Sequence, residues 1–202
     1  MKYLKIYTEF VGGIMYILKN SLTQSHQIIS SIVEKGDTVV DATAGNGNDT
    51  LFLAELVGEE GMVYSFDIQK QALSSTDKKL QEKQLKSRVK LINDGHQNIK
   101  KYITEPIKAI MFNLGYLPGG NHSIGTKGCT TIEAIKGGME LLTVHGIISI
   151  VVYYGGDSGF DEKNEVMDFI KTIDYKKYTV MRTDFVNQIN CPPILICIEK
   201  NK

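Results

Sequence analysis

Short apolar runs alternate along this chain with longer stretches in which apolar residues recur at helical spacing. Seven runs are candidate strands, at residues 37–42, 62–67, 88–93, 107–113, 145–154, 178–185 and 194–199. Stretches with helical spacing lie at residues 22–33, 51–57, 72–85, 132–142 and 160–173. This regular alternation predicts a doubly wound, mostly parallel sheet with helices on its faces.

The last two candidate strands depart from this pattern, because the segment between them, FVNQINCPP, has no room for a crossover helix. They are therefore expected to pair as an antiparallel hairpin at the sheet edge. The predicted fold class is α/β: a seven-stranded, mostly parallel, Rossmann-like sheet with an antiparallel C-terminal hairpin. Residues 1–202 are interpreted as a single domain, on which an N-terminal extension and helix (1–34) pack.

Composition narrows the class of protein. The chain is 42% hydrophobic and 23% charged, as soluble globular domains are, and no apolar run approaches the ~20 residues that cross a bilayer. Lys5 and Glu9 interrupt the apolar N-terminus, which disfavours a signal peptide. The three cysteines lack CxxC spacing and are interpreted as free thiols. We expect a cytoplasmic protein with no membrane segment and no metal.

Charge is a weak guide to the partner. Lys and Arg together number 23, as do Asp and Glu, and only two of the basic residues are arginine. Basic residues outnumber acidic ones between positions 70 and 108. Such a segment is typical of a phosphate-binding face and equally of a solvated helix surface, so both interpretations stay open.

The first candidate strand runs into the glycine loop DATAGNGNDT (41–50), where Gly45 and Gly47 permit a tight turn and close approach of a ligand. A dinucleotide fingerprint would need glycine at Thr50, and Asp49 at the following helix N-terminus would repel phosphate. S-adenosylmethionine carries a sulfonium and an ammonium group, so an acidic loop suits it. A role for Asp49 as the cap of its helix is the alternative.

The next three strands also end in polar residues. Asp67 follows the second strand, where a carboxylate can accept hydrogen bonds from a ribose diol, as it also does in NAD enzymes. Asp94, Gly95 and His96 follow the third strand, where they can flank an adenine or cap a helix. The fourth strand ends in NLGYLPGGN (113–121). Together these ends predict one site at the carboxyl edge of the sheet.

The motifs VVDATAGNGNDTLFLA, FDIQ, DGHQN, NLGYLPGGN and NQINCPPILICIEK resemble those of class I S-adenosylmethionine-dependent methyltransferases. Within that class the chain resembles a small family first labelled rRNA-methylase-like, whose characterised members are MnmM-type tRNA methyltransferases. The resemblance implies S-adenosyl-L-methionine as cofactor and tRNA as partner. It further implies methylation of the amino group of wobble 5-aminomethyl-2-thiouridine, and a homodimer. Met15 is an alternative initiator to Met1, since residues 1–14 precede the family's usual start.

The resemblance also implies particular cofactor contacts. They fall on Asn46 and Asn48 in the glycine loop, on Asp67 and Gln69 after the second strand, and on Asp94 and His96 after the third. Position 48 is often histidine in similar sequences, so Asn48 departs from the pattern.

The family's catalytic segment corresponds to the end of the fourth strand. Amino-group methyltransferases often carry Asn-Pro-Pro-Tyr there, and this chain has Asn113-Leu114-Gly115-Tyr116, without the prolines. Asn113 is expected to accept a hydrogen bond from the substrate amine, and Tyr116 to stack on a uracil ring, which is worth roughly 1–3 kcal/mol. The alternative makes Asn113 a turn cap and Tyr116 a packed surface aromatic.

An aliphatic amine is largely protonated at neutral pH, so the site must desolvate it or accept its proton. His122, just past the loop, is the best-placed acceptor, with an exposed loop histidine as the alternative; His26 and His145 have weaker claims. Side chains expected near the site's edge form the candidate RNA-binding set: Lys127, Tyr153, Arg182, Asn187 and Gln188, with Tyr154 and Asn190 beside them.

Other functions remain open on the sequence. A methyltransferase of a small-molecule amine or of rRNA fits the same loops, and so does a non-catalytic adenosyl-ligand or RNA-binding protein. A nicotinamide enzyme fits least, because of Asp49 and Thr50. Titration with S-adenosylmethionine against NAD separates the cofactors.

Overall fold

The computed structural model describes residues 18–115, 125–154 and 159–202. The strands are β1 (Thr38–Asp41), β2 (Met62–Phe66), β3 (Val89–Ile92), β4 (Ile107–Leu114), β5 (Leu142–Val152), β6 (Tyr178–Thr183) and β7 (Ile194–Lys200). The helices are α1 (Ser21–Ile32), α2 (Asn48–Val57), α3 (Lys70–Glu82), α4 (Ile99–Tyr102), α5 (Gly128–Leu141) and α6 (Gly159–Ile170), with 3-10 turns η1 (Lys86–Arg88) and η2 (His96–Asn98).

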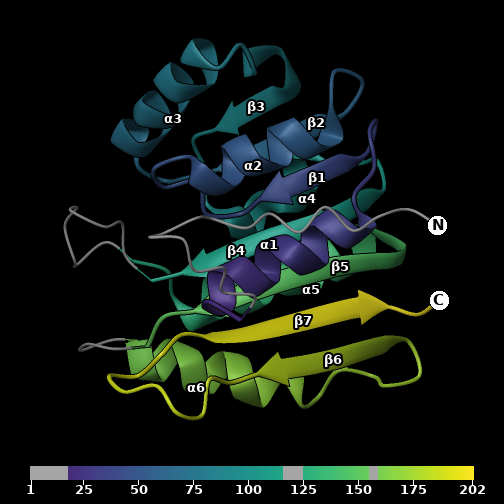
Figure 1. Cartoon of the computed structure of the whole chain (residues 1–202). Coiled ribbons are helices and arrows are strands. Elements are labelled where there is room, and N and C mark those ends of the chain that lie inside the picture. The colour runs from purple at the N-terminus through teal and green to yellow at the C-terminus, as the bar shows by residue number, and fades with distance from the viewer. Residues whose placement is uncertain (1–17, 116–124, 155–158) are drawn as a thin grey trace.

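All the strands belong to one seven-stranded sheet of order β3-β2-β1-β4-β5-β7-β6 (Figure 1). β7 pairs antiparallel with both β5 and β6, and the remaining pairs are parallel. The predicted fold class is therefore confirmed, including the terminal hairpin. Two details differ. β5 begins at Leu142, before the predicted start of this strand at His145, whose φ is 61°. The four-residue helix α4 was not predicted, because one turn carries no periodicity to detect.

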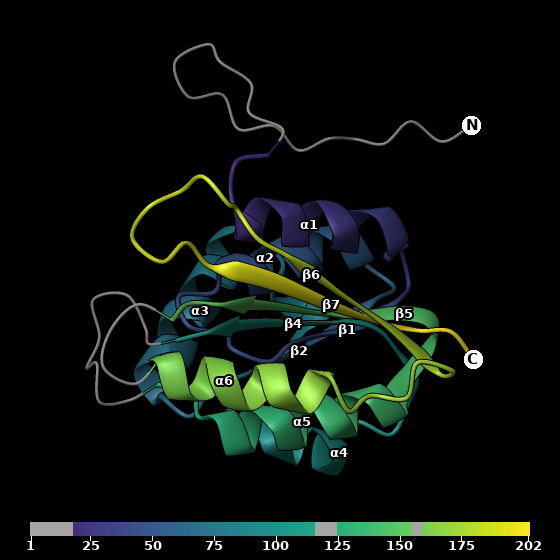
Figure 2. The ribbon, with the colours of Figure 1, turned by 90° about the horizontal axis from the view of Figure 1, so that it is seen from below.

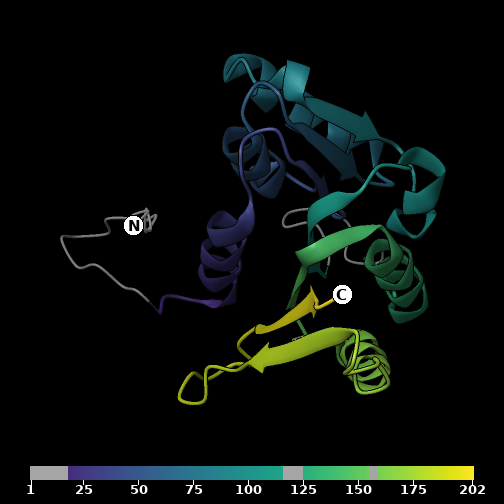
Figure 3. The ribbon, with the colours of Figure 1, turned by 90° about the vertical axis from the view of Figure 1, so that its right-hand side faces the viewer.

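The sheet is covered on both faces, with α1, α2 and α3 on one side and α4, α5 and α6 on the other (Figure 2). A view along another axis separates α1 from α5 and α6 in the same way (Figure 3). Successive residues of a strand point to opposite faces. Along β4, Ala109 and Met111 accordingly join the core under α1 and α2, while Ile110 and Phe112 join the core under α5.

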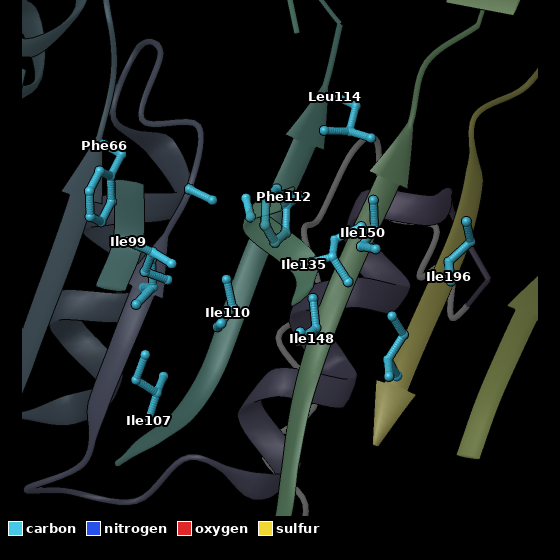
Figure 4. Packing of buried hydrophobic residues seen from close by; sticks show 14 of the residues in the cluster. Phe66, Ile99, Ile107, Ile110, Phe112, Leu114, Ile135, Ile148, Ile150 and Ile196 are labelled. Carbon is cyan, nitrogen blue, oxygen red and sulfur yellow. The ribbon is translucent and has the colours of Figure 1, made fainter. Parts of the chain in front are cut away.

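Branched aliphatic side chains dominate the core on the α5 side (Figure 4). Ile148 and Ile150 of β5 and Ile196 of β7 are fully buried there, beside Ile135 of α5. Central strands buried on both faces have no polar face, which explains why their sequences are apolar runs without alternation. In the part of the chain that the structure describes, no helix is long and apolar enough to cross a membrane.

β1 and β4 are neighbours in the sheet. The helix after β1 lies on one face and the helix that follows β4 lies on the other, so the strand order reverses here (Figure 2). In open α/β sheets ligands bind outside the carboxyl ends of the strands at such a switch point. The residues beyond β1 and β4 are therefore the first place to look for a site.

Candidate active site

The glycine loop between β1 and α2 needs its glycines. Gly45 and Gly47 have φ values of 50° and 79°, in the left-handed region that favours glycine. A Cβ atom on Gly47 would lie 2.7 Å from Oγ1 of Thr76 on α3. Lys79 Nζ donates to the Asn46 carbonyl at 2.7 Å and to Asn48 Oδ1 at 3.2 Å, so α3 supports the loop from outside. The Asn48 side chain is exposed and faces this lysine.

Asp67, directly after β2, connects this loop to α3. Its Oδ2 accepts a hydrogen bond from the Gly45 amide at 2.9 Å, and its Oδ1 accepts from the Gln69 amide at 2.7 Å. Gln69 is the half-exposed N-cap residue of α3. Asp67 thus fixes the glycine loop and leaves carboxylate lone pairs available on a partly exposed surface.

The turn after β3 is held by its own polar groups. Hydrogen bonds from Asn98 and Tyr102 hold the pKa of Asp94 below its usual value, and the Gly95 amide donates to the same carboxylate. His96 is buried, and its Nδ1 lies 3.0 Å from the Ala42 carbonyl. A carbonyl oxygen only accepts, so Nδ1 carries the hydrogen. Burial lowers the pKa of His96, and the neutral ring ties this turn to the end of β1.

Asn113 lies near the end of β4, and the glycine-loop region holds it from two sides. Its backbone N–H donates to Thr43 Oγ1 at 2.8 Å, and its side-chain Nδ2 donates to Asp49 Oδ2 at 3.2 Å. The other oxygen of Asp49 is 2.7 Å from His26 Nε2 on α1. Asp49 therefore does not cap α2, whose N-cap Gly47 makes no side-chain cap bond. The turn that Asn113 would cap in the alternative interpretation lies outside the described residues.

A second carboxylate, Asp41, lies fully buried at the end of β1. It accepts from the Thr43 amide at 3.0 Å and from Thr50 Oγ1 at 2.6 Å, and Thr50 also bonds Ser65 of β2. Burial, together with the negative charge of Asp49, raises the pKa of Asp41 to about 7. The Thr50 hydroxyl thus links β1 and β2 by hydrogen bonds, which a glycine at this position could not make.

Two predicted catalytic residues, Tyr116 and His122, lie outside the described residues. The positions that flank their segment are joined: Gly115 N–H donates to Thr126 Oγ1 at 3.0 Å, and Thr126 N–H donates to the Gly115 carbonyl at 3.1 Å. Thr126 Oγ1 also donates to the buried Glu162 of α6 at 2.6 Å.

The candidate RNA-binding residues lie at or beyond the carboxyl ends of β5 and β6 or at the start of α5. Lys127 is the exposed N-cap residue of α5, and Tyr153 directly follows β5. Burial and the negative charge of Asp49 raise the pKa of Tyr153, which lies near that carboxylate. Arg182 pairs with Asp184 at 2.6 Å. Asn187 and Gln188 are exposed between β6 and β7, and within the described chain no hydrogen bond joins members of this set.

Three side chains outside the predicted set of site residues lie around Asn113: His26, Thr43 and Asp49. The sequence drew attention to Asp49 as an acidic residue in a glycine loop and to His26 only as a weaker candidate proton acceptor. His26 belongs to a helix that precedes the sheet, and nothing in its spacing indicates which face of the fold it reaches.

Among residues 18–115, 125–154 and 159–202, no group of three or more His, Cys, Asp or Glu side chains is arranged to hold a metal ion. Two open surface hollows lie elsewhere, one between η2, α4 and α5 and one beside the start of β5.

The sheet order, with β7 inserted antiparallel between β5 and β6, and the glycine loop bonded to an acidic residue after β2 define a class I S-adenosylmethionine-dependent methyltransferase. The particular family follows from the sequence match. The chain belongs to the family described as "Putative rRNA methylase", which matches residues 63–199. The predicted family, enzyme class and cofactor are confirmed at this level.

Similar proteins agree with this assignment. A chloroplastic tRNA (mnm5s2U34)-methyltransferase of Arabidopsis thaliana is 35% identical over 93% of this chain and 72% of that protein. A Clostridium thermocellum structure bearing the same rRNA-methylase description is 63% identical, with a TM-score of 0.89 over 90% of this chain and 98% of that chain. A Streptococcus mutans methyltransferase solved with SAH is 47% identical, with a TM-score of 0.83 over 90% and 98% of the two chains.

Proposed function

We propose that this protein methylates the aminomethyl group of wobble 5-aminomethyl-2-thiouridine in tRNA and produces 5-methylaminomethyl-2-thiouridine. The observation that carries the proposal is the 35% identity, over 93% of the chain, to a protein named tRNA (mnm5s2U34)-methyltransferase. The site supports the proposal through Asn113. Its side chain lies at the switch point and donates a hydrogen bond from Nδ2 to Asp49.

The residues present fit S-adenosylmethionine. The glycine loop can come close to the cofactor at Gly45 and Gly47. A Cβ at Gly47 would collide with α3, and both positions have a positive φ that strains other residues. Asp67 would accept hydrogen bonds from the ribose diol, and Asp94, Gly95 and His96 would flank the adenine. Asn46, Asn48 and Gln69 complete the proposed set. A carboxylate at the start of α2 disfavours a pyrophosphate there and tolerates a cationic ligand.

When bound, S-adenosylmethionine supplies the methyl group: the amine nitrogen bonds to that carbon, and the carbon–sulfur bond breaks with its electron pair left on sulfur. The protein's contribution is to hold the amine in line, and positioning of this kind is worth about 7–11 kcal/mol. Asn113 would accept an N–H of the amine, and Tyr116 would stack on the uracil. His122 is the proposed acceptor of the proton that the ammonium form must lose.

The experiment compares nucleosides from cells with and without the gene. We expect tRNA from the deletion strain to accumulate 5-aminomethyl-2-thiouridine, and the purified protein to convert it with S-adenosylmethionine alone, in the presence of a chelator. Unchanged tRNA nucleosides, from a protein that still binds the cofactor, would contradict the proposal. Methylation of rRNA or of small amines in parallel assays would then identify the substrate.

Assembly and compartment complete the proposal. The family resemblance implies a homodimer, and the free cysteines and the N-terminal sequence are the basis for proposing the cytoplasm. Light scattering of the purified protein measures the first, and fractionation of cells measures the second. A monomer that retains full activity would remove the dimer from the proposal.

A further inference from the structure

Three polar side chains from distant parts of the sequence form a chain that ends at the proposed catalytic asparagine. His26 Nε2 of α1 is 2.7 Å from Asp49 Oδ1 at the start of α2. Asp49 Oδ2 is 3.2 Å from Asn113 Nδ2 near the end of β4. His26 and Asp49 both lie outside residues 63–199, which the family description matches.

The chemistry of these groups fixes the orientation of the amide. A carboxylate only accepts hydrogen bonds, so the Asn113 side chain must turn its NH2 group toward Asp49. Its Oδ1 then points away from Asp49 and is left as an acceptor. Without Asp49, the hydrogen bond that selects this orientation is lost, and the amide can also turn its NH2 group to the position where an acceptor is required.

Asp49 is itself held in place. Its side chain is 7% exposed and that of His26 is 26% exposed. The His26 ring stacks on Phe52 of α2, with centroids 4.0 Å apart and planes within 7°. Each oxygen of the Asp49 carboxylate therefore accepts from a separate donor, His26 on one side and Asn113 on the other. These two bonds restrict rotation of the carboxylate group.

The helix that carries His26 is anchored by two buried serines. Ser25 Oγ lies 2.6 Å from Ser149 Oγ of β5, and the Ser21 hydroxyl donates to the Pro193 carbonyl before β7. These contacts place α1 across the sheet with His26 next to the start of α2. The serines explain why this helix docks in one position.

We propose that His26 and Asp49 are positioning residues that set the amide of Asn113 with its oxygen toward the target amine. This inference rests on the proposed function, because it assigns the oxygen of Asn113 to the substrate. Asp49 acts through Asn113, and His26 acts through Asp49.

A double-mutant cycle tests the first link. Asp49→Ala should lower kcat about tenfold or more, with the S-adenosylmethionine Kd within about threefold of wild type. In an Asn113→Ala background the same change should have almost no further effect on kcat, since the residue through which it acts is gone. Independent, multiplying effects would overturn the inference, as would a loss of cofactor affinity comparable to the loss of kcat.

A histidine series tests the second link. His26→Ala should lower kcat, while His26→Gln, which keeps a side-chain N–H donor, should restore kcat to within about threefold of wild type. His145→Ala is the matched control. His145 lies near the start of β5, is exposed and pairs with Glu199 of β7, away from Asn113. Equal loss in His26→Ala and His26→Gln would contradict the hydrogen-bond role.

A measurement without substrate separates this inference from the proposed function. In nitrogen-15 spectra the side-chain amide of Asn113, assigned by its disappearance in Asn113→Ala, should shift in Asp49→Ala and, less strongly, in His26→Ala. An Asn113 amide signal unchanged by Asp49→Ala would overturn the inference even if the tRNA is methylated. A shifted signal in a protein that does not act on tRNA would overturn the proposed function alone.

Discussion

At the scale of single residues, the carboxylates of the site differ in burial and in hydrogen-bond partners, and their roles differ accordingly. Asp41 is buried against β2 with one hydroxyl and one amide donor, and its pKa is raised to about 7. Asp94 is held below its usual pKa by hydrogen bonds from Asn98 and Tyr102. Asp67 bonds two backbone amides at the partly exposed edge. The position of each carboxylate at or after the end of its strand could be predicted, but these differences depend on burial and on hydrogen-bond partners from other segments, which the sequence does not encode locally.

The Asp67→Ala change should weaken S-adenosylmethionine binding at least about tenfold, because charged hydrogen bonds contribute about 1.5–3 kcal/mol each. The loss would combine a ribose contact with the bond that holds the Gly45 amide. Calorimetric titration measures it. Asp168→Ala, on the exposed surface of α6, is the control and should bind normally. Wild-type affinity in a folded Asp67→Ala protein would remove Asp67 from the site.

The raised pKa of Asp41 predicts a pH-dependent stability. The folded pKa of about 7 lies above the ordinary value of 3.8, so the folded state binds more protons between these limits. The free energy of unfolding should therefore fall from about pH 4 to pH 7, with a slope from this group of at most about 1.4 kcal/mol per pH unit.

Asp41→Asn removes that contribution; its amide oxygen can still accept from the Thr43 N–H, and its NH2 group donates to Thr50 Oγ1 in place of the bond that the carboxylate accepts. Urea denaturation across pH should show the mutant gaining stability over wild type from about pH 4 to pH 7 and a constant difference above pH 7. A difference that does not change with pH would place the Asp41 pKa near its ordinary value.

At the scale of elements, the sequence predicted the strands, the longer helices and the terminal hairpin, because periodicity and loop length report them directly. It did not predict that α1 reaches the site. That contact depends on Ser25 meeting Ser149, which lies 124 positions away, and pairings at such separation leave no local pattern. The bonds around Thr126 were also beyond prediction, since one hydroxyl group joins Gly115, directly after β4, to Glu162 of α6.

Thr126→Val keeps the shape of the side chain and removes that hydroxyl. It removes the hydroxyl that accepts from the Gly115 amide and donates to Oε2 of the buried Glu162, while Oε1 of Glu162 keeps its bond from Thr131, so we expect a loss of about 1–3 kcal/mol in the free energy of unfolding. Turnover should fall more than cofactor affinity, since Gly115 directly follows the catalytic strand. Thr130→Val is the control, because its hydroxyl bonds only the nearby Lys127 carbonyl on an exposed surface. Equal stability of the two variants would contradict this role.

At the scale of the whole molecule, the zero net charge of the chain and the position of the site at one edge of the sheet bear on the proposed RNA substrate. Several lysines of the basic segment are engaged within the protein: Lys79 supports the glycine loop, Lys86 pairs with Asp77, and Lys100 pairs with Glu140. The alternative of a general phosphate-binding face is thereby weakened. Cations at the carboxyl edge of the sheet are then the ones expected to meet a nucleic acid.

Lys127 is exposed at that edge, at the start of α5, and is predicted to contact a phosphate. Lys127→Ala should weaken tRNA binding a few fold and reduce the slope of log Kd against log salt by about 1, because one fewer counterion is released. Lys176→Ala is the matched control: Lys176 is exposed in the turn before β6, at the opposite edge of the sheet. Filter binding over a range of salt concentrations measures both slopes. If the two variants lose affinity equally, charge acts over the whole surface, and the RNA is not held at the edge where the cofactor loop and Asn113 lie.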